Sequence, residues 1–309
     1  MGVTRSLLLA ASQSAWLRAR ATRYRFVRRS VNRFMPGETL KDALGAAAAL
    51  LEKNIGAVLT QLGENIKQAS EAAGVAAHYF EVLDAIHQRN LRAEVSVKLT
   101  QLGLDLSPDV CLEHVKGIVS RERKQATVWI DMESSSYVDA TLEIYRRALA
   151  AFPNTGVCLQ AYLFRTKNDL QNLLPLKPSI RLVKGAYAEP PNVAFPKKRD
   201  VDESYFALAR ELLRARKTGQ CARVAFATHD ARLIGRICEF AAREGFSERE
   251  IEVQMLYGIQ RAEQDRLARE GHPMNVLISY GDYWYPWFVR RLAERPANVW
   301  FMVRNLFAR

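Results

Sequence analysis

The segment from residue 180 to residue 187 reads Ile-Arg-Leu-Val-Lys-Gly-Ala-Tyr and joins an apolar run to two cations and a flexible turn. A continuous apolar run is typical of a β-strand that is covered on both faces, as in a parallel sheet or barrel. Gly185 allows the backbone to approach a ligand closely. Arg181 and Lys184 therefore indicate an anionic ligand at a strand end, where the active sites of such folds lie. Taken alone, the segment is also compatible with an alternative interpretation, a surface strand with solvated charges.

Strand-like and helix-like segments alternate along the rest of the chain. The predicted strands are 56–62, 93–99, 127–131, 156–160, 180–184, 223–228, 250–256 and 274–278, and amphipathic helical patterns between them include 138–151, 204–215 and 231–244. Eight such repeats without a long linker predict an α/β fold, a (β/α)8 TIM-type barrel, and 309 residues are typical of one. We expect an N-terminal helical arm at 1–45 and the barrel at 46–309.

The composition excludes several classes of protein. Hydrophobic residues make up 49% and charged residues 25%, which is neither a disordered nor a fibrous composition. No Gly-x-Gly-x-x-Gly follows a strand, so a Rossmann-type dinucleotide site is not supported. The cysteines have no Cys-x-x-Cys spacing, and we expect buried thiols in a reducing compartment rather than a metal site. They are Cys111, Cys158, Cys221 and Cys238.

The positive charge is concentrated at the N-terminus. The net charge is +12, and residues 1–37 hold eight arginines and no acid, which leaves +4 for the remainder. Such an arm fits an anionic membrane surface, packing on its own barrel or a partner subunit, or a mitochondrial transit peptide. No base-reading motif follows, so nucleic acid is not expected. The apolar run 7–11 is too short to span a membrane. We expect a cytoplasmic protein, with the inner face of the membrane or a mitochondrial matrix as alternatives.

Polar residues suited to a ligand pocket recur where the predicted strands end. Asp131 ends the predicted third strand and can pair with a cationic group, while Lys98 lies near the end of the second strand and can pair with an anionic group. Arg290 and Arg291, on a helix after the last strand, can form charge-assisted bonds to an anionic group such as a carboxylate. The alternative for these arginines is a solvated helix surface, where Arg290 and Glu294 would gain about 0.2–0.5 kcal/mol as an i,i+4 pair.

Six motifs then resemble the proline dehydrogenase family, the flavin-dependent barrel enzymes that begin proline catabolism. The motifs are VKLTQLGLDLS (97–107), DMES (131–134), QAYLFRT (160–166), RLVKGAY (181–187), FATHD (226–230) and RRLAERP (290–296). The resemblance runs from about residue 20 to the end. No aldehyde dehydrogenase module follows, so the chain resembles the single-function form.

The resemblance implies FAD as the cofactor and assigns roles to individual residues. The positions that match the family's FAD contacts are Met132, Gln160, Arg181, Lys184, Gly185, Ala186, Thr228 and His229. Those that match its substrate contacts are Lys98, Tyr187, Leu256, Arg290 and Arg291. Asp131 and Arg181 take the catalytic positions, with Arg181 near the reactive flavin nitrogen. Glu64 takes the position of a gate residue that pairs with Arg290. A lone histidine is more often a structural group than a catalyst, and we expect His229 to contact the cofactor.

The implied reaction is oxidation of L-proline to Δ1-pyrroline-5-carboxylate, with electrons passed to a quinone. The sequence departs from the family where Trp287 and Leu277 replace two active-site tyrosines, although Tyr280 and Tyr285 lie near Leu277. Losing hydroxyl donors would alter ring packing, which keeps a related cyclic imino acid such as hydroxyproline as an alternative substrate. A degenerate barrel that only binds membrane or nucleic acid is a third hypothesis. The many charges expected inside the pocket argue against it, because a scaffold gains nothing from burying them.

Overall fold

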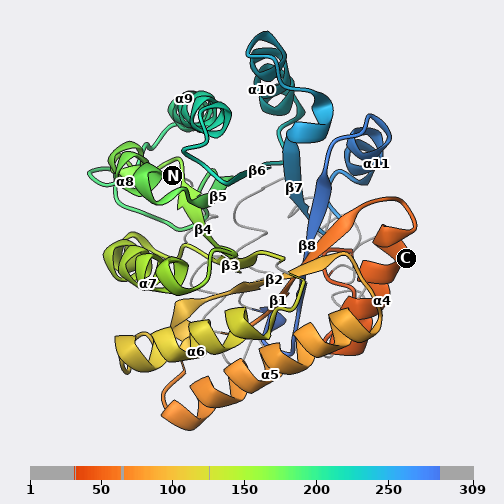
Figure 1. Ribbon diagram of the computed structural model, residues 1–309, viewed down its shortest axis with the longest axis vertical. Coiled ribbons are helices and arrows are strands. Elements are labelled where there is room, and N and C mark those ends of the chain that lie inside the picture. The colour runs from red at the N-terminus through yellow and green to blue at the C-terminus, as the bar shows by residue number, and fades with distance from the viewer. Residues whose placement is uncertain (1–30, 32, 64–65, 125, 286–309) are drawn as a thin grey trace, which may run out of the picture.

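The computed structural model describes residues 31, 33–63, 66–124 and 126–285, and it forms a closed barrel of eight parallel strands. Each strand pairs with the next, and β8 pairs with β1 through Leu277 and Val58, which closes the barrel (Figure 1). The strands are β1 Gly56–Gln61, β2 Ala93–Val97, β3 Val128–Ile130, β4 Thr155–Gln160, β5 Ser179–Val183, β6 Arg223–Ala227, β7 Glu252–Leu256 and β8 Met274–Tyr280. The predicted (β/α)8 fold is confirmed.

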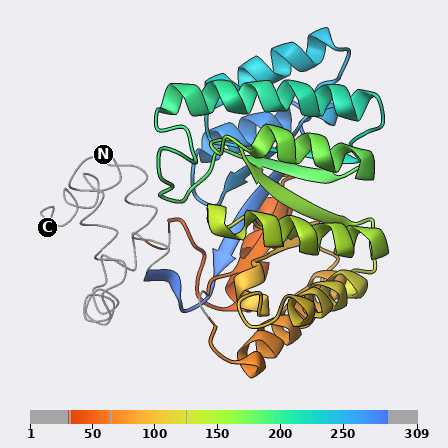
Figure 2. The ribbon, with the colours of Figure 1, turned by 90° about the vertical axis from the view of Figure 1, so that its left-hand side faces the viewer.

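Helices lie side by side around the outside of the strands (Figure 2). They are α4 Leu40–Leu51, α5 Ala69–Gln88, α6 Pro108–Arg121, α7 Val138–Ala151, α8 Thr166–Leu173, α9 Lys198–Lys217, α10 Ala231–Arg243 and α11 Arg261–Arg269. Within the described ranges, none of these helices is both long enough and apolar enough to cross a lipid bilayer.

Every predicted strand end lies within two residues of the observed one. Helix α7 has the predicted bounds, whereas α9 begins earlier than 204, which brings Lys198 into its first turn. Strand β8 continues past 278 to Tyr280. Helix α4 spans the expected boundary at residue 45 and packs on β1 and β8. Because residues 1–30 lie outside the described ranges, the division into arm and barrel stays a prediction.

Side-chain caps determine where several helices begin. Thr39 caps α4: its hydroxyl accepts a hydrogen bond from the Asp42 amide at 3.2 Å, and the Asp42 carboxylate accepts one from the Thr39 amide at 3.1 Å. Asp230 caps α10 by accepting from the Leu233 amide. This second cap lies just after β6, so it brings the positive end of α10 to the edge where the strands end.

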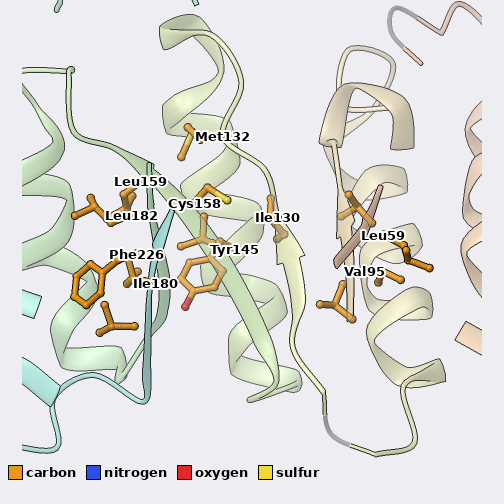
Figure 3. Close-up of a cluster of buried hydrophobic side chains, with 14 of the residues drawn as sticks. Leu59, Val95, Ile130, Met132, Tyr145, Cys158, Leu159, Ile180, Leu182 and Phe226 are labelled. Atoms are coloured by element: carbon orange, nitrogen blue, oxygen red, sulfur yellow. The ribbon is translucent and has the colours of Figure 1, made fainter. Parts of the chain in front are cut away.

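The core has an outer layer between the strands and the helices. Leu59, Val95, Ile130, Leu182 and Phe226 lie in this layer and are almost completely buried (Figure 3). Burying a side chain of this size contributes about 1.5–3 kcal/mol. The four cysteines are free: three are buried as predicted, and the fourth, Cys238, is half-buried.

The barrel interior is more polar than the branched apolar filling that is usual for this fold. Glu94, Arg223 and Glu252 lie towards the N-terminal ends of the strands, and Arg181 and Asp131 lie nearer the C-terminal ends. All five are at least half-buried. The barrel interior therefore contains two sets of charges: Arg181 and Asp131 near the C-terminal ends of the strands, and a deeper set towards the N-terminal ends.

Candidate active site

A cavity with a volume of about 670 Å³ opens at the C-terminal ends of the strands. Every predicted site residue that the structure describes lines it: Lys98, Asp131, Met132, Gln160, Arg181, Lys184, Gly185, Ala186, Tyr187, Thr228, His229 and Leu256. The remaining predicted residues, Glu64, Arg290 and Arg291, lie outside the described residues. A smaller cavity of about 280 Å³ at the opposite end of the barrel contains none of the predicted residues.

Lys98, Asp131 and Arg181 form one ion cluster in the cavity wall. Arg181 Nη2 lies 2.5 Å from Asp131 Oδ1, and Lys98 Nζ lies 3.3 Å from Asp131 Oδ2. Burial acts to raise the pKa of Asp131, but the charges of Lys98 and Arg181 outweigh it and hold that pKa below its ordinary value. Burial likewise acts to lower the pKa of Lys98, and Asp131 reverses the effect and raises it. All three groups therefore stay charged at neutral pH.

Arg181 is held by several neighbours that the sequence analysis did not single out. Its side chain is buried, and Nε donates to Cys158 Sγ at 2.8 Å. Nη2 also donates to Ser96 Oγ at 2.6 Å, and Nη1 donates to Gln254 Oε1 at 3.4 Å. Burial raises the pKa of Cys158 to about 12, so its sulfur is a neutral thiol. These contacts fix the guanidinium group in its own plane.

A second cluster of four charged groups joins β5, β6 and α9. Lys184 Nζ lies 2.5 Å from Asp202 and 3.1 Å from Asp230, and Lys198 bridges the same two carboxylates. Burial acts to raise the pKa of Asp230, but hydrogen bonds from Lys184 and Lys198 lower it to about 2. Lys198 and Arg232 both line the cavity beside the start of α10. Cations beside a helix N-terminus are suited to a phosphate group.

Gln160 presents an unused acceptor to the cavity. Its amide nitrogen donates to the carbonyl oxygens of Met132 and Glu133, each at 3.2 Å. Its amide oxygen is buried and has no hydrogen-bond partner among the described residues. Because a buried acceptor without a partner is costly, this atom indicates that a ligand donates to it.

Gly185 is required by its backbone and by its neighbour. Its φ of 114° lies in the region that favours glycine, and an added Cβ would overlap the Tyr162 ring. The turn after β5 therefore packs directly on Tyr162. Gly185 therefore lies in a turn that glycine adopts without strain, and it lines the cavity.

Several residues of the cavity wall were not anticipated as site residues, and two of them are Phe34 and Lys198. Phe34 precedes α4 and lines the cavity together with Tyr257. The backbone at Arg33 lies so close to Gly258 that an added Cβ there would overlap it. Lys198 is the other, because its helix starts earlier than predicted. The sequence carries only a weak signal for Phe34, since it lies outside every strand.

The structure decides which residue of β8 faces the cavity. Leu277 lines it and packs on Val58 and Trp129 in the barrel interior. Tyr280 faces the opposite side of the sheet, where its hydroxyl lies 2.9 Å from His78 Nε2. Tyr285 is not among the described residues that line the cavity either. Tyr280 therefore does not supply a hydroxyl in place of the family tyrosine that Leu277 replaces. The other replacement, Trp287, lies outside the described residues.

Fold and site together define a class of protein: a (β/α)8-barrel enzyme whose cavity combines a carboxylate, several cations and an apolar wall for a small charged substrate and a larger ligand. Comparison with known proteins narrows the class. The sequence profile of proline dehydrogenase matches residues 43–304. Proline dehydrogenase 1 of Bacillus subtilis is 38% identical over 90% of this chain and 91% of its own. Proline dehydrogenase of Deinococcus radiodurans is 36% identical over 89% of each chain.

The chain belongs to the proline dehydrogenase family. Among solved structures, proline utilization A (PutA) from Bdellovibrio bacteriovorus superposes with a TM-score of 0.83 at 22% identity. The match covers 99% of this chain and 38% of that protein. At this identity the superposition shows the shared barrel fold alone.

Proposed function

We propose that this protein oxidises L-proline to Δ1-pyrroline-5-carboxylate with FAD, as the first step of proline catabolism. The observation that carries the proposal is the convergence of Lys98, Asp131 and Arg181 in one cavity of a chain that belongs to this family. The similar proteins from Bacillus and Deinococcus are named for proline, which favours proline over a related cyclic imino acid.

The residues of the cavity fit FAD. Gln160 offers its unpartnered oxygen to a donor such as a ring N–H, and Leu256 and Tyr257 offer apolar surface. Lys184 and Lys198 would face the pyrophosphate beside the start of α10, where the helix dipole also favours an anion. When bound, FAD supplies the acceptor for the hydride that proline loses.

The charges of the site fit a zwitterionic amino acid. Lys98 is a cation suited to the carboxylate of proline, and Arg290 and Arg291 stay predicted partners of the same group. Asp131 is suited to the ring ammonium. Oxidation removes a hydride from the ring carbon beside nitrogen, so nitrogen must first lose a proton to free its electron pair. Because the lowered pKa makes Asp131 a weak base, its role is to orient the amine, and the proton is released to water before the hydride leaves.

We further propose that electrons leave to a quinone and that the basic N-terminal arm brings the protein to an anionic membrane surface. The support is the excess of arginine in residues 1–37. The test is binding of the full chain to vesicles with and without anionic lipid. Binding that does not depend on lipid charge would contradict the proposed role of the arm at the membrane.

Anaerobic addition of L-proline to the purified holoprotein tests the main proposal. We expect the visible absorption of bound FAD to bleach with proline, and to bleach more slowly with hydroxyproline or pipecolate. Asp131→Asn serves as the matched variant, because it keeps the side-chain shape and removes the charge. A yellow protein that stays oxidised with proline but bleaches with another imino acid would end the substrate proposal and leave the flavin site standing.

A further inference from the structure

Trp129 occupies the centre of the barrel interior, one layer below the proposed active site. It lies on β3 two residues before Asp131 and has no exposed surface. The guanidinium carbon of Arg181 lies 5.0 Å from the centroid of its ring, and that of Arg223 lies 5.2 Å from it. Both distances fall within the range of a cation–π interaction, which is stronger in a site shielded from water.

The indole ring is itself anchored from below. Trp129 Nε1 donates to Glu94 Oε2 at 2.8 Å, and Glu94 also pairs with Arg223. Glu252 pairs with Arg223 from the other side, with Nε to Oε2 at 2.7 Å. Glu252 Oε1 in turn accepts from Gln254, whose oxygen accepts from Arg181. A continuous set of buried polar contacts thus leads from the base of the barrel to the active site.

The neighbouring strand is built to receive this ring. Gly156 pairs with Trp129 across β3 and β4, and a Cβ added at Gly156 would lie 2.6 Å from the indole. Only a glycine leaves room for the ring at this register. The indole is therefore held by a hydrogen bond at one edge and by close packing against β4.

We propose that Trp129 is a positioning residue for Arg181, and this inference rests on the proposed function. The hydrogen bonds to Ser96, Asp131 and Cys158 restrain the guanidinium within its plane. The ring of Trp129 adds a contact from the barrel interior, with its centroid 5.0 Å from the guanidinium carbon. Because Nη1 makes only the 3.4 Å bond to Gln254 among the described residues, it is the nitrogen with a donor left for a ligand. The ring sets the depth at which this donor meets the cavity.

The charges support the same role. Lys98, Asp131 and Arg181 carry a net charge of +1 above the ring, and Glu94, Arg223 and Glu252 carry −1 below it. The lower carboxylates attract Arg181 downwards, away from the cavity. A rigid aromatic ring between the two groups keeps Arg181 at the cavity wall, where its charge stabilises negative charge that develops on a bound ligand.

The test compares Trp129→Leu and Trp129→Phe with wild-type holoprotein. Leucine removes the ring, so we expect flavin reduction at saturating proline to slow by about tenfold, as loss of a buried cation–π interaction implies. We expect the apparent dissociation constant for proline to change less than about threefold. The midpoint potential of the flavin, measured without proline, should become more negative because Arg181 moves away from it. Phenylalanine keeps a ring, and its values should lie close to wild type.

Phe226→Leu is the matched control, because it removes a buried aromatic ring from the outer core without touching Arg181. A folded Trp129→Leu protein with the wild-type rate and potential would overturn the inference, as would an equal effect of Phe226→Leu. If wild-type flavin is not reduced by proline but the potential still shifts in Trp129→Leu, the proposed substrate fails and the positioning role stands.

Discussion

At the scale of single residues, the site depends on charges that are unfavourable alone and stable together. Asp131 is paired with Lys98 and Arg181, and it also accepts from Ser96 at 2.8 Å. Removing one member of such a buried group leaves the others without compensation, which costs far more than a surface ion pair contributes. The residues that perform the proposed chemistry are therefore also residues on which the fold depends.

Asp131→Asn should lower both activity and stability. The variant leaves Lys98 and Arg181 facing each other, so we expect a loss of about 3–5 kcal/mol in the free energy of unfolding. The pKa of Asp131 is lowered in the folded state, so its contribution is fully present above the ordinary value of 3.8 and fades as the pH falls below it. Urea unfolding of wild type and Asp131→Asn from pH 8 to pH 3 measures how this contribution to the free energy of unfolding depends on pH. A difference between the two proteins that stays unchanged down to pH 3 would contradict the expected ionisation.

Gly185→Ala should weaken FAD binding. The new methyl group would overlap Tyr162, and alanine is strained at a φ of 114°, at a cost of about 1–3 kcal/mol. We expect the dissociation constant of FAD to rise by about tenfold or more, as measured by flavin fluorescence. Gly219→Ala is the control, because Gly219 also has a positive φ, of 73°, but no atom lies near its added Cβ. Equal weakening by both variants would show that the close approach to Tyr162 is unimportant.

At the scale of elements, helix starts and strand ends meet at one edge of the barrel and supply charge there. Asp230 caps α10 and binds Lys184 of the loop after β5 and Lys198 of α9. One carboxylate thus links a cap to the ion cluster proposed to face the pyrophosphate. The helix dipole and the two lysines act in the same direction at this point.

Asp230→Asn separates the cap from the charge, because asparagine also caps helices well. The pKa of Asp230 is about 2 in the folded protein against an ordinary 3.8, so its ionic stabilisation is complete above about pH 4 and is lost as the pH falls towards 2. We expect the stability difference from wild type to be constant at neutral pH and to shrink over that interval. Glu239→Gln, which removes a carboxylate from a mostly exposed side chain on the same helix, is the control variant. If the stability difference between wild type and Asp230→Asn stayed constant down to pH 2, the lowered pKa of Asp230 would be refuted.

The strands were predictable because continuous apolar runs ending in polar residues are visible without the fold. The residues that support the site residues were not predicted from the sequence, although their positions follow a simple rule. Ser96, Trp129 and Cys158 each precede a predicted site residue by two positions, so they point into the same interior. Their partners come from other strands, and only the register of the closed barrel reveals which side chains meet. Phe34 is harder still, since no strand positions it.

At the scale of the whole molecule, the barrel is completed by chain from outside the eight repeats. Val31 and Met35 are buried, and Phe34 lines the cavity. Trp284, after the last strand, donates to Glu38 at 2.9 Å. The segment before α4 is thereby joined to both the β7–α11 loop and the chain after β8. Residues just N-terminal to the barrel are part of the cavity wall.

Phe34→Ala tests whether this wall takes part in cofactor binding. Phe34 lines the cavity together with Tyr257, and its backbone lies close to Gly258, so removing the ring opens the cavity where the apolar part of a large ligand would pack. We expect FAD to bind about tenfold more weakly, because burying an aromatic side chain against a ligand contributes on the order of 1.5–3 kcal/mol. Titration of the apoprotein with FAD, followed by flavin fluorescence, measures the change.

Met35→Ala is the matched control, because Met35 is buried next to Phe34 but does not line the cavity. Its truncation should lower the free energy of unfolding by about 2–5 kcal/mol and leave FAD affinity near the wild-type value. The two variants therefore separate a wall that contacts the cofactor from a segment that only supports the barrel. If Phe34→Ala bound FAD as tightly as wild type, or if Met35→Ala weakened binding equally, the segment would have a purely structural role.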